Sequence, residues 1–197
     1  MMASKDSSSI TFADVLGNSF YFIEDKVTGF DEDSFKMNGQ PPMSCWIQSY
    51  DRKFLVVKST ECIFEDRNLG ERKQSDSKFK IQAYRNTELQ QQTKAVMLYS
   101  VGQDEKVQVV CCRTDSEVCS EIMNLADLNY IEDSGHKAMF FMKNLKNDTY
   151  MFESTLHKGR FLSFEPTRDS CLHKLILHPH EVDDTDHTIN MIVSKEK

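Results

Sequence analysis

Glycine, proline and tryptophan are scarce in this 197-residue sequence, which holds seven glycines, four prolines and the single tryptophan Trp46. It contains no Gly-x-x-x-x-Gly-Lys-Ser/Thr loop, no Gly-x-Gly-x-x-Gly fingerprint and no Gly-x-Ser-x-Gly elbow. Phosphate loops, dinucleotide-binding folds and α/β-hydrolases depend on these glycines for their sharp turns and close backbone approaches. The sequence therefore lacks the usual signatures of these enzyme classes.

Long apolar runs and an excess of positive charge are also missing. No run approaches the roughly 20 residues that a membrane-spanning helix needs, and the first residues lack the basic start and apolar stretch of a secretory signal. We therefore expect synthesis in the cytoplasm. The 24 basic and 31 acidic residues give a net charge of −7, which disfavours nucleic acid and anionic lipid as partners.

Six cysteines are present: Cys45, Cys62, Cys111, Cys112, Cys119 and Cys171. A reducing compartment keeps such residues as thiols, so we expect most of them to be small buried apolar groups. Cys111 and Cys112 are adjacent, and neighbouring side chains in a strand point to opposite faces, which disfavours a redox site formed by these two.

Candidate chemical groups elsewhere are scattered. A cluster of Cys171, His173, His178 and His180 offers metal-ligating atoms, but its spacing is not typical of a metal site, and Pro179 favours solvated histidines at a turn. The carboxylates of Asp183 and Asp184 are interpreted as solvated loop charges. Trp46, in an apolar run, is interpreted as a core anchor. We therefore expect no catalytic residue, metal or cofactor.

Short runs rich in β-branched, aromatic and aliphatic residues dominate the sequence from about residue 44 onward. Eleven of them, each bounded by charged or turn-forming residues, are predicted strands: 44–49, 53–58, 61–65, 78–84, 95–101, 106–112, 137–143, 149–155, 160–164, 172–177 and 189–194. Evenly spaced short strands without helices between them predict an all-β barrel or sandwich.

The segment 114–128 is ambiguous. Thr114 and Glu117 have the spacing of a capping box, and Val118, Ile122 and Leu125 recur at helical spacing. Short apolar stretches do not distinguish the two structures, so residues 117–123 could instead be a twelfth strand.

The first part of the chain has a different character. Residues 7–12 and 19–23 could form strands, and the turn-forming residues Gly39 to Pro42 follow an acidic stretch. Residues 1–33 carry two lysines against seven acidic residues. This pattern indicates a detachable segment.

The C-terminal third carries a recognisable pattern of aromatic, serine and aliphatic residues. An aromatic residue, any residue and a serine are followed later by an aromatic residue, a leucine and a small residue; these places are filled by Phe152, Ser154, Phe161, Leu162 and Ser163. The pattern resembles the interleukin-1 superfamily of cytokines. Lys158 stands where many members have proline and Phe164 where many have threonine, which is compatible with the interleukin-18 branch.

The resemblance implies a β-trefoil of twelve short strands, in which a six-stranded barrel is closed by a cap of hairpins. It further implies a monomeric pro-inflammatory cytokine of the interferon-gamma-inducing type, which is not an enzyme. Its expected partners are interleukin-18-type receptor chains, both primary and accessory, and a soluble decoy binding protein.

The resemblance also implies a maturation step, in which an inflammatory caspase cuts a cytoplasmic precursor after an aspartate. Asp33 fills the required position, Phe30 lies where such caspases prefer a bulky apolar residue, and Ser34 is small enough to follow the cut. The expected products are a propeptide, 1–33, and a mature cytokine domain, 34–197. The latter is expected to be secreted by a non-conventional route that needs no signal peptide.

Receptor contacts carried over from the resemblance are Lys36, Asp66 and Arg67. Two other classes of function stay open from the residues alone: another β-trefoil binding module, such as a growth factor or a lectin, and an intracellular β-barrel carrier. The net charge disfavours a heparin-binding growth factor, and one tryptophan cannot supply the repeated Gln-x-Trp motifs of trefoil lectins. A carrier would need a hollow barrel.

Overall fold

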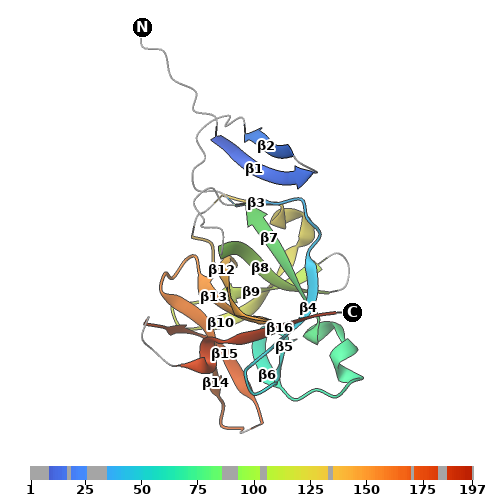
Figure 1. Cartoon of the computed structure of the whole chain (residues 1–197). Helices are drawn as coiled ribbons and strands as arrows, with labels where there is room; N and C mark the ends of the chain where they lie inside the picture. Colours follow the sequence, from blue (N-terminus) through green and yellow to red (C-terminus); the bar gives the residue numbers. More distant parts are fainter. Residues whose placement is uncertain are drawn as a thin grey trace. The chain divides into compact units, whose positions relative to one another are not determined.

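A computed structural model describes residues 9–16, 19–25, 35–85, 93–102, 106–132, 135–169, 171–181 and 186–196. The backbone divides into two compact units, Met1–Glu32 and Asp33–Lys197. The first contains the antiparallel strands β1 (Ser9–Leu16) and β2 (Ser19–Asp25), whose pairing is irregular between Phe12 and Asp14. The two strands predicted near the start of the chain are therefore confirmed, and both are longer than predicted (Figure 1).

The second unit is built from short strands joined by turns and single-turn 3₁₀-helices (Figure 1). Its strands are β3 (Phe35–Met37), β4 (Met43–Gln48), β5 (Phe54–Lys58), β6 (Glu61–Glu65), β7 (Phe79–Arg85), β8 (Thr93–Val101), β9 (Lys106–Cys112), β10 (Val118–Asn124), β11 (Tyr130–Ile131), β12 (Phe140–Lys146), β13 (Thr149–Ser154), β14 (Arg160–Pro166), β15 (His173–Pro179) and β16 (Met191–Lys195). The 3₁₀-helices are η1 (Glu71–Lys73), η2 (Ser75–Ser77), η3 (Leu125–Leu128) and η4 (His187–Ile189). Among the described residues, no helix has the length and apolarity needed to cross a bilayer.

Six of these strands form a closed ring. β4 pairs with β7, β7 with β8, β8 with β12, β12 with β13, β13 with β16, and β16 returns to β4, always antiparallel. Closing a sheet in this way removes the unpaired edge strands that would otherwise promote aggregation.

Three hairpins, β5–β6, β9–β10 and β14–β15, supply six further strands, which bring the barrel and its cap to twelve; β3 and β11 are additional. The three hairpins also bond to one another, because β15 pairs with β6 and Glu117 bridges to Ile176. The amide of Ser120 donates to the carbonyl of Thr60 at 2.9 Å. A six-stranded barrel capped by three hairpins is a β-trefoil, and the predicted all-β class and twelve-strand count are confirmed.

Residues 118–124 are strand β10, which settles the ambiguity in the segment 114–128. β10 pairs with β9 over its whole length, from Val118 opposite Cys112 to Asn124 opposite Lys106. Helical spacing is thus overridden by a neighbouring strand that satisfies the backbone hydrogen bonds of this segment. Two very short strands, β3 and β11, were not predicted; they pair with each other.

The core consists of two clusters of buried side chains. The barrel cluster contains residues from all six ring strands, including Phe140, Phe152 and Leu98, whose exposed fraction is at most 1%. The flank cluster lies on the other face of β8 and β9 and contains Met97, Val109 and further residues from β3, η3 and β11. Because large side chains fill the barrel, the structure does not favour the hollow interior that a carrier needs.

The cysteine predictions are confirmed, but the one for Trp46 is wrong. Five cysteines are buried, Cys171 is exposed, and all six are free thiols. Cys111 belongs to the flank cluster and Cys112 to the barrel cluster, so their side chains do point to opposite faces. Trp46 lies outside both clusters, is half-buried, and donates its indole N–H to the carbonyl of Arg72 at 2.9 Å.

Candidate functional site

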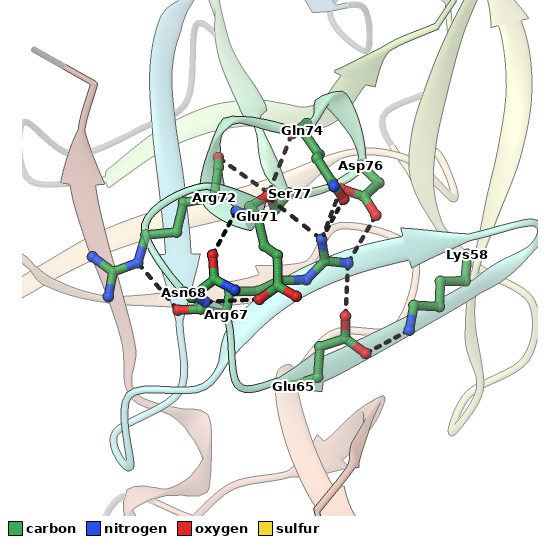
Figure 2. A network of polar contacts seen from close by, with 9 residues as sticks. All are labelled: Lys58, Glu65, Arg67, Asn68, Glu71, Arg72, Gln74, Asp76 and Ser77. Carbon is green, nitrogen blue, oxygen red and sulfur yellow. Dashed lines mark hydrogen bonds and ion pairs between the residues drawn. The ribbon is translucent and has the colours of Figure 1, made fainter.

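The loop between β6 and β7 is organised around the guanidinium of Arg67 (Figure 2). Its Nη2 lies 2.6 Å from Glu65 Oε1 and 2.8 Å from Asp76 Oδ2, and its Nη1 donates to Gln74 Oε1 at 2.8 Å. Only 6% of the Arg67 side chain is exposed. Arg67 therefore holds together the end of β6 and the 3₁₀-helix η2.

Burial by itself lowers the pKa of the Arg67 guanidinium, because it disfavours the charged form. The hydrogen bonds and attraction of Asp76 and Glu65 outweigh this effect and raise the pKa above its ordinary value. Arg67 is thus a permanent positive charge with its negative partners already in place.

Side-chain hydrogen bonds fix the rest of this loop. Asn68 Oδ1 accepts from the amides of Gly70 and Glu71, at 2.9 and 3.0 Å, and Glu71 Oε2 accepts from the amide of Asn68 at 2.8 Å. The hydroxyl of Ser77 lies 3.2 to 3.3 Å from the carbonyl oxygens of Glu71, Arg72 and Gln74 (Figure 2). A loop ordered before binding loses less entropy when a partner docks.

Asp66 and Leu69 are among the exposed residues of this loop. The Asp66 side chain is 82% exposed and forms an ion pair with Lys53 at 3.2 Å. Leu69 is 76% exposed, the largest exposure among the large hydrophobic residues of the described chain. Leu69 could not be singled out from the sequence, because a lone leucine in a polar stretch has no periodicity.

Lys36 lies on a different element. It is exposed on β3, where it stands opposite Arg85 of β7 and Tyr130 of β11, while its neighbour Phe35 is 1% exposed. Among the described residues, no hydrogen bond or ion pair joins Lys36 to Asp66 or Arg67. The structure thus brings Asp66 and Arg67 into one loop and places Lys36 on a separate strand; their receptor contacts stay predictions.

A pocket of about 570 Å³ lies beside β11. Its lining comprises Met97, Lys106, Ile122, Met123, Asn124, Asp127, Leu128, Tyr130, Ile131, Glu132 and His136. Ile122 and Tyr130 are 68% and 43% exposed, so the rim is partly apolar. The sequence did not predict this pocket, which forms where β9, β10, η3 and β11 meet.

The residues of the aromatic-serine pattern belong mainly to the packed interior. Phe152 and Ser154 are fully buried, and Leu162 and Ser163 are 2% and 1% exposed. The Ser154 hydroxyl accepts from the amide of His157 at 3.0 Å, and the Ser163 hydroxyl lies 2.7 Å from that of Thr188. Phe161 is half-buried and meets the His180 ring edge-on. These residues stabilise the fold.

The prediction of solvated histidines near the C-terminus is wrong for His173 and His180, because aromatic rings pack against both, whereas the side chain of His178 is 44% exposed. His173 stacks on Phe164 with ring centroids 5.3 Å apart and lies 3.7 Å from Asp51, and all three histidines of the predicted cluster are half-buried. His178 Nε2 lies 3.9 Å from Asp186. No group of three or more potential metal ligands occurs in the part of the chain that the structure describes. Asp183 and Asp184 lie outside it.

The residues predicted for proteolytic processing, Phe30, Asp33 and Ser34, also lie outside the described residues. The strands that follow show which part of the fold a cut after Asp33 would leave intact. β3 begins at Phe35, and the first ring strand begins at Met43. All twelve trefoil strands therefore follow Asp33.

Comparison with known proteins gives both a sequence relative and a structural one. The chain is 24% identical to interleukin-18 of Sus scrofa over 185 residues, which cover 90% of each protein. A crystal structure of a chicken IL-1 hydrophobic cavity mutant has a TM-score of 0.55 at 16% identity, covering 81% of this chain and 99% of that one. The chain is similar in sequence to interleukin-18 and in fold to interleukin-1.

The likeness to interleukin-1 in fold accords with the barrel and its three-hairpin cap. A designed three-fold symmetric protein, ThreeFoil, also matches, with a TM-score of 0.48 and 10% identity over 77% of this chain and 97% of that one. No family model matches the sequence. The interleukin-1 superfamily resemblance inferred from Phe152 to Ser163 is therefore confirmed by the interleukin-18 match and the fold.

Proposed function

We propose that the chain is the precursor of an interleukin-18-type pro-inflammatory cytokine. In this proposal an inflammatory caspase cuts after Asp33, and the mature part, 34–197, leaves the cell by a signal-peptide-independent route. It then assembles the primary and accessory interleukin-18-type receptor chains, and a soluble decoy binding protein limits its activity. The observation that carries the proposal is the match to interleukin-18 over 90% of both chains.

The position of the strands supports the processing step. A cut after Asp33 leaves the barrel, the cap and β3 in one product, and it falls next to the boundary between the two compact units. Proteolysis generally requires an accessible extended segment outside the packed core.

The processing step is tested with purified chain and an inflammatory caspase, with Asp31→Ala as a matched control for Asp33→Ala. We expect wild-type chain and the Asp31→Ala variant to yield a product that starts at Ser34, and the Asp33→Ala variant to stay uncut. N-terminal sequencing of the product identifies the bond. Cutting of the Asp33→Ala variant at the same place contradicts this step.

The receptor step is tested by measuring binding of the mature part to immobilised interleukin-18-type receptor chains. Lys36→Ala and Asp66→Ala are expected to slow association, most strongly at low salt, because exposed charges at an interface mainly steer encounter. Lys143→Ala, an exposed lysine of β12, is the control. If neither substitution changes binding, Lys36 and Asp66 do not belong to the interface. If the mature part does not bind the receptor chains at all, the receptor assignment is wrong.

A further inference from the structure

Two cysteines face each other across the β9–β10 hairpin. In its antiparallel register, Cys111 of β9 is the direct partner of Cys119 of β10. Both side chains belong to the flank cluster, with 0% and 5% of their surface exposed, and both are free thiols. The two residues are eight positions apart in the sequence, so only the strand pairing reveals that they meet.

The hairpin geometry suits a covalent bridge between these two residues. The amide of Arg113 donates to the carbonyl of Glu117 at 2.8 Å, which fixes the turn end of the hairpin and hence its register. Directly opposed residues in an antiparallel pair have Cα atoms about 4.5 to 5.5 Å apart. Disulfides span Cα separations of about 4.4 to 6.8 Å. Cys111 and Cys119 can therefore be joined without changing the register.

The other buried cysteines near this pair belong to the barrel cluster and not to the flank cluster. Cys112 belongs to the barrel cluster on the opposite face of β9, where its sulfur lies 3.5 Å from the Ser154 hydroxyl. Cys62 also belongs to the barrel cluster. Both thiols lie near enough to Cys119 for it to raise their pKa values. In the register of the hairpin, however, the residue directly opposite Cys119 is Cys111, which favours this pairing.

We propose that Cys111 and Cys119 are an oxidisable thiol pair that closes to a cross-strand disulfide by exchange with a low-molecular-weight disulfide such as oxidised glutathione. One cysteine thiolate attacks the small disulfide, forms a mixed disulfide and releases one small thiol. The second cysteine thiolate then attacks the protein sulfur of that mixed disulfide and releases the second small thiol. Two cysteine sulfurs are oxidised, one small disulfide is reduced to two thiols, and the two cysteine protons end on these thiols.

Exchange requires local opening, because both thiols are buried. Burial raises the pKa of the Cys111 thiol, which keeps it protonated and unreactive in the closed hairpin. β10 stands at the end of the strand order and pairs along its length with β9 alone. Its other described backbone links include the bridge from Glu117 to Ile176 and the hydrogen bond from Ser120 to Thr60. Opening of β10 therefore separates it from β9 and breaks these links, together with the packing of Val118 and Cys119 in the two core clusters. The closed disulfide would hold β10 in place.

The test uses the full chain in a Cys171→Ser background, which removes the exposed thiol. The reduced protein is incubated with oxidised glutathione, quenched with an alkylating reagent in denaturant at low pH so that buried thiols also react, and examined by mass spectrometry without reduction. We expect alkylatable cysteines to fall from five to three, with the loss of two hydrogens and no retained glutathione. Tryptic peptides containing Cys111 and Cys119 should be linked.

Cys112→Ser is the matched control, because Cys112 lies in the same peptide as Cys111 on the opposite face of β9. The linked peptides are expected to persist in the Cys112→Ser variant and to be absent from Cys119→Ser. Hydrogen exchange of the β10 amides should be slower in the oxidised form. A bond between any other pair, or stable glutathione adducts without a bridge, overturns the proposal. Both outcomes can be identified in the chain that keeps all five buried cysteines, so the test does not depend on whether the Cys112→Ser and Cys119→Ser variants fold.

Discussion

Individual buried residues explain why the aromatic-serine pattern could be recognised from sequence. Phe152 is fully buried in the barrel cluster, and Ser154, two positions later on the same face of β13, uses its hydroxyl to hold the turn that follows. Both are required by packing and hydrogen bonding within the fold. They therefore identify a structural family, whereas binding specificity must come from exposed residues such as Asp66, whose environment the sequence does not reveal.

Phe152→Ala is expected to destabilise the protein by about 3 to 5 kcal/mol, because removing a fully buried ring leaves a cavity in the barrel. Urea unfolding followed by circular dichroism measures the change in the free energy of unfolding. Phe161→Ala is the control, since Phe161 is only half-buried and should cost clearly less. Equal losses for the two variants would contradict the assignment of Phe152 to the core.

Arg67→Ala is expected to lower the free energy of unfolding by about 2 kcal/mol, because Glu65 and Asp76 would lose a shared, largely buried partner. Lys58→Ala removes the more exposed partner of Glu65 and should cost under about 1 kcal/mol. Urea unfolding distinguishes the two variants. A loss for Arg67→Ala no larger than that for Lys58→Ala would show that the network in Figure 2 is dispensable for stability.

At the scale of elements, strands with strong β-branched patterns could be predicted closely, and short or context-dependent ones could not. β6 and β9 have the predicted bounds, because each is an apolar run between charged residues. β12 starts at Phe140, whereas the predicted strand started at residue 137. The apolar residues Ala138 and Met139 extend the strand pattern in the sequence, but they are buried in the segment that precedes the strand. β3 and β11 pair with each other, although the partners Lys36 and Tyr130 are 94 positions apart in the sequence. The pattern of neighbouring residues cannot reveal a pairing between such distant segments.

Docking of one hairpin against the next can be tested at β10. The buried Ser120 hydroxyl donates to the carbonyl of Ser59 at 3.0 Å, beside the backbone bond between Ser120 and Thr60. Ser120→Ala should cost about 1 kcal/mol of unfolding free energy, because the carbonyl loses one of its two side-chain donors and keeps the amide of Gln108. It should also speed hydrogen exchange of the β10 amides. Unchanged exchange would mean that this contact does not hold the hairpin.

For the whole molecule, buried thiols connect stability to pH. Burial raises the pKa of Cys45 from 9.0 to about 12, and burial together with Cys119 raises that of Cys62 to about 12. Because the pKa of each thiol is higher in the folded protein than in the unfolded chain, its contribution is fully present below pH 9. It is lost as the pH rises toward 12.

The free energy of unfolding is therefore expected to fall by about 1.4 kcal/mol per pH unit for each such cysteine above about pH 9. Urea unfolding under reducing conditions at several alkaline pH values measures the slope. Cys62→Ala should make the slope shallower, because it removes one of the buried thiols. A flat profile between pH 9 and 11 would contradict the prediction.

The seam of the barrel joins its first and last strands, with Cys45 opposite Lys195 and Gln48 opposite Ile192. During synthesis on the ribosome, the strand that completes the seam is the last of the twelve to be made. Until then, β4 and β13 each lack a neighbour, and the aromatic interior stays open to solvent. A nascent chain that stalls before residue 191 would consequently need a chaperone, because no earlier stopping point gives a sealed structure.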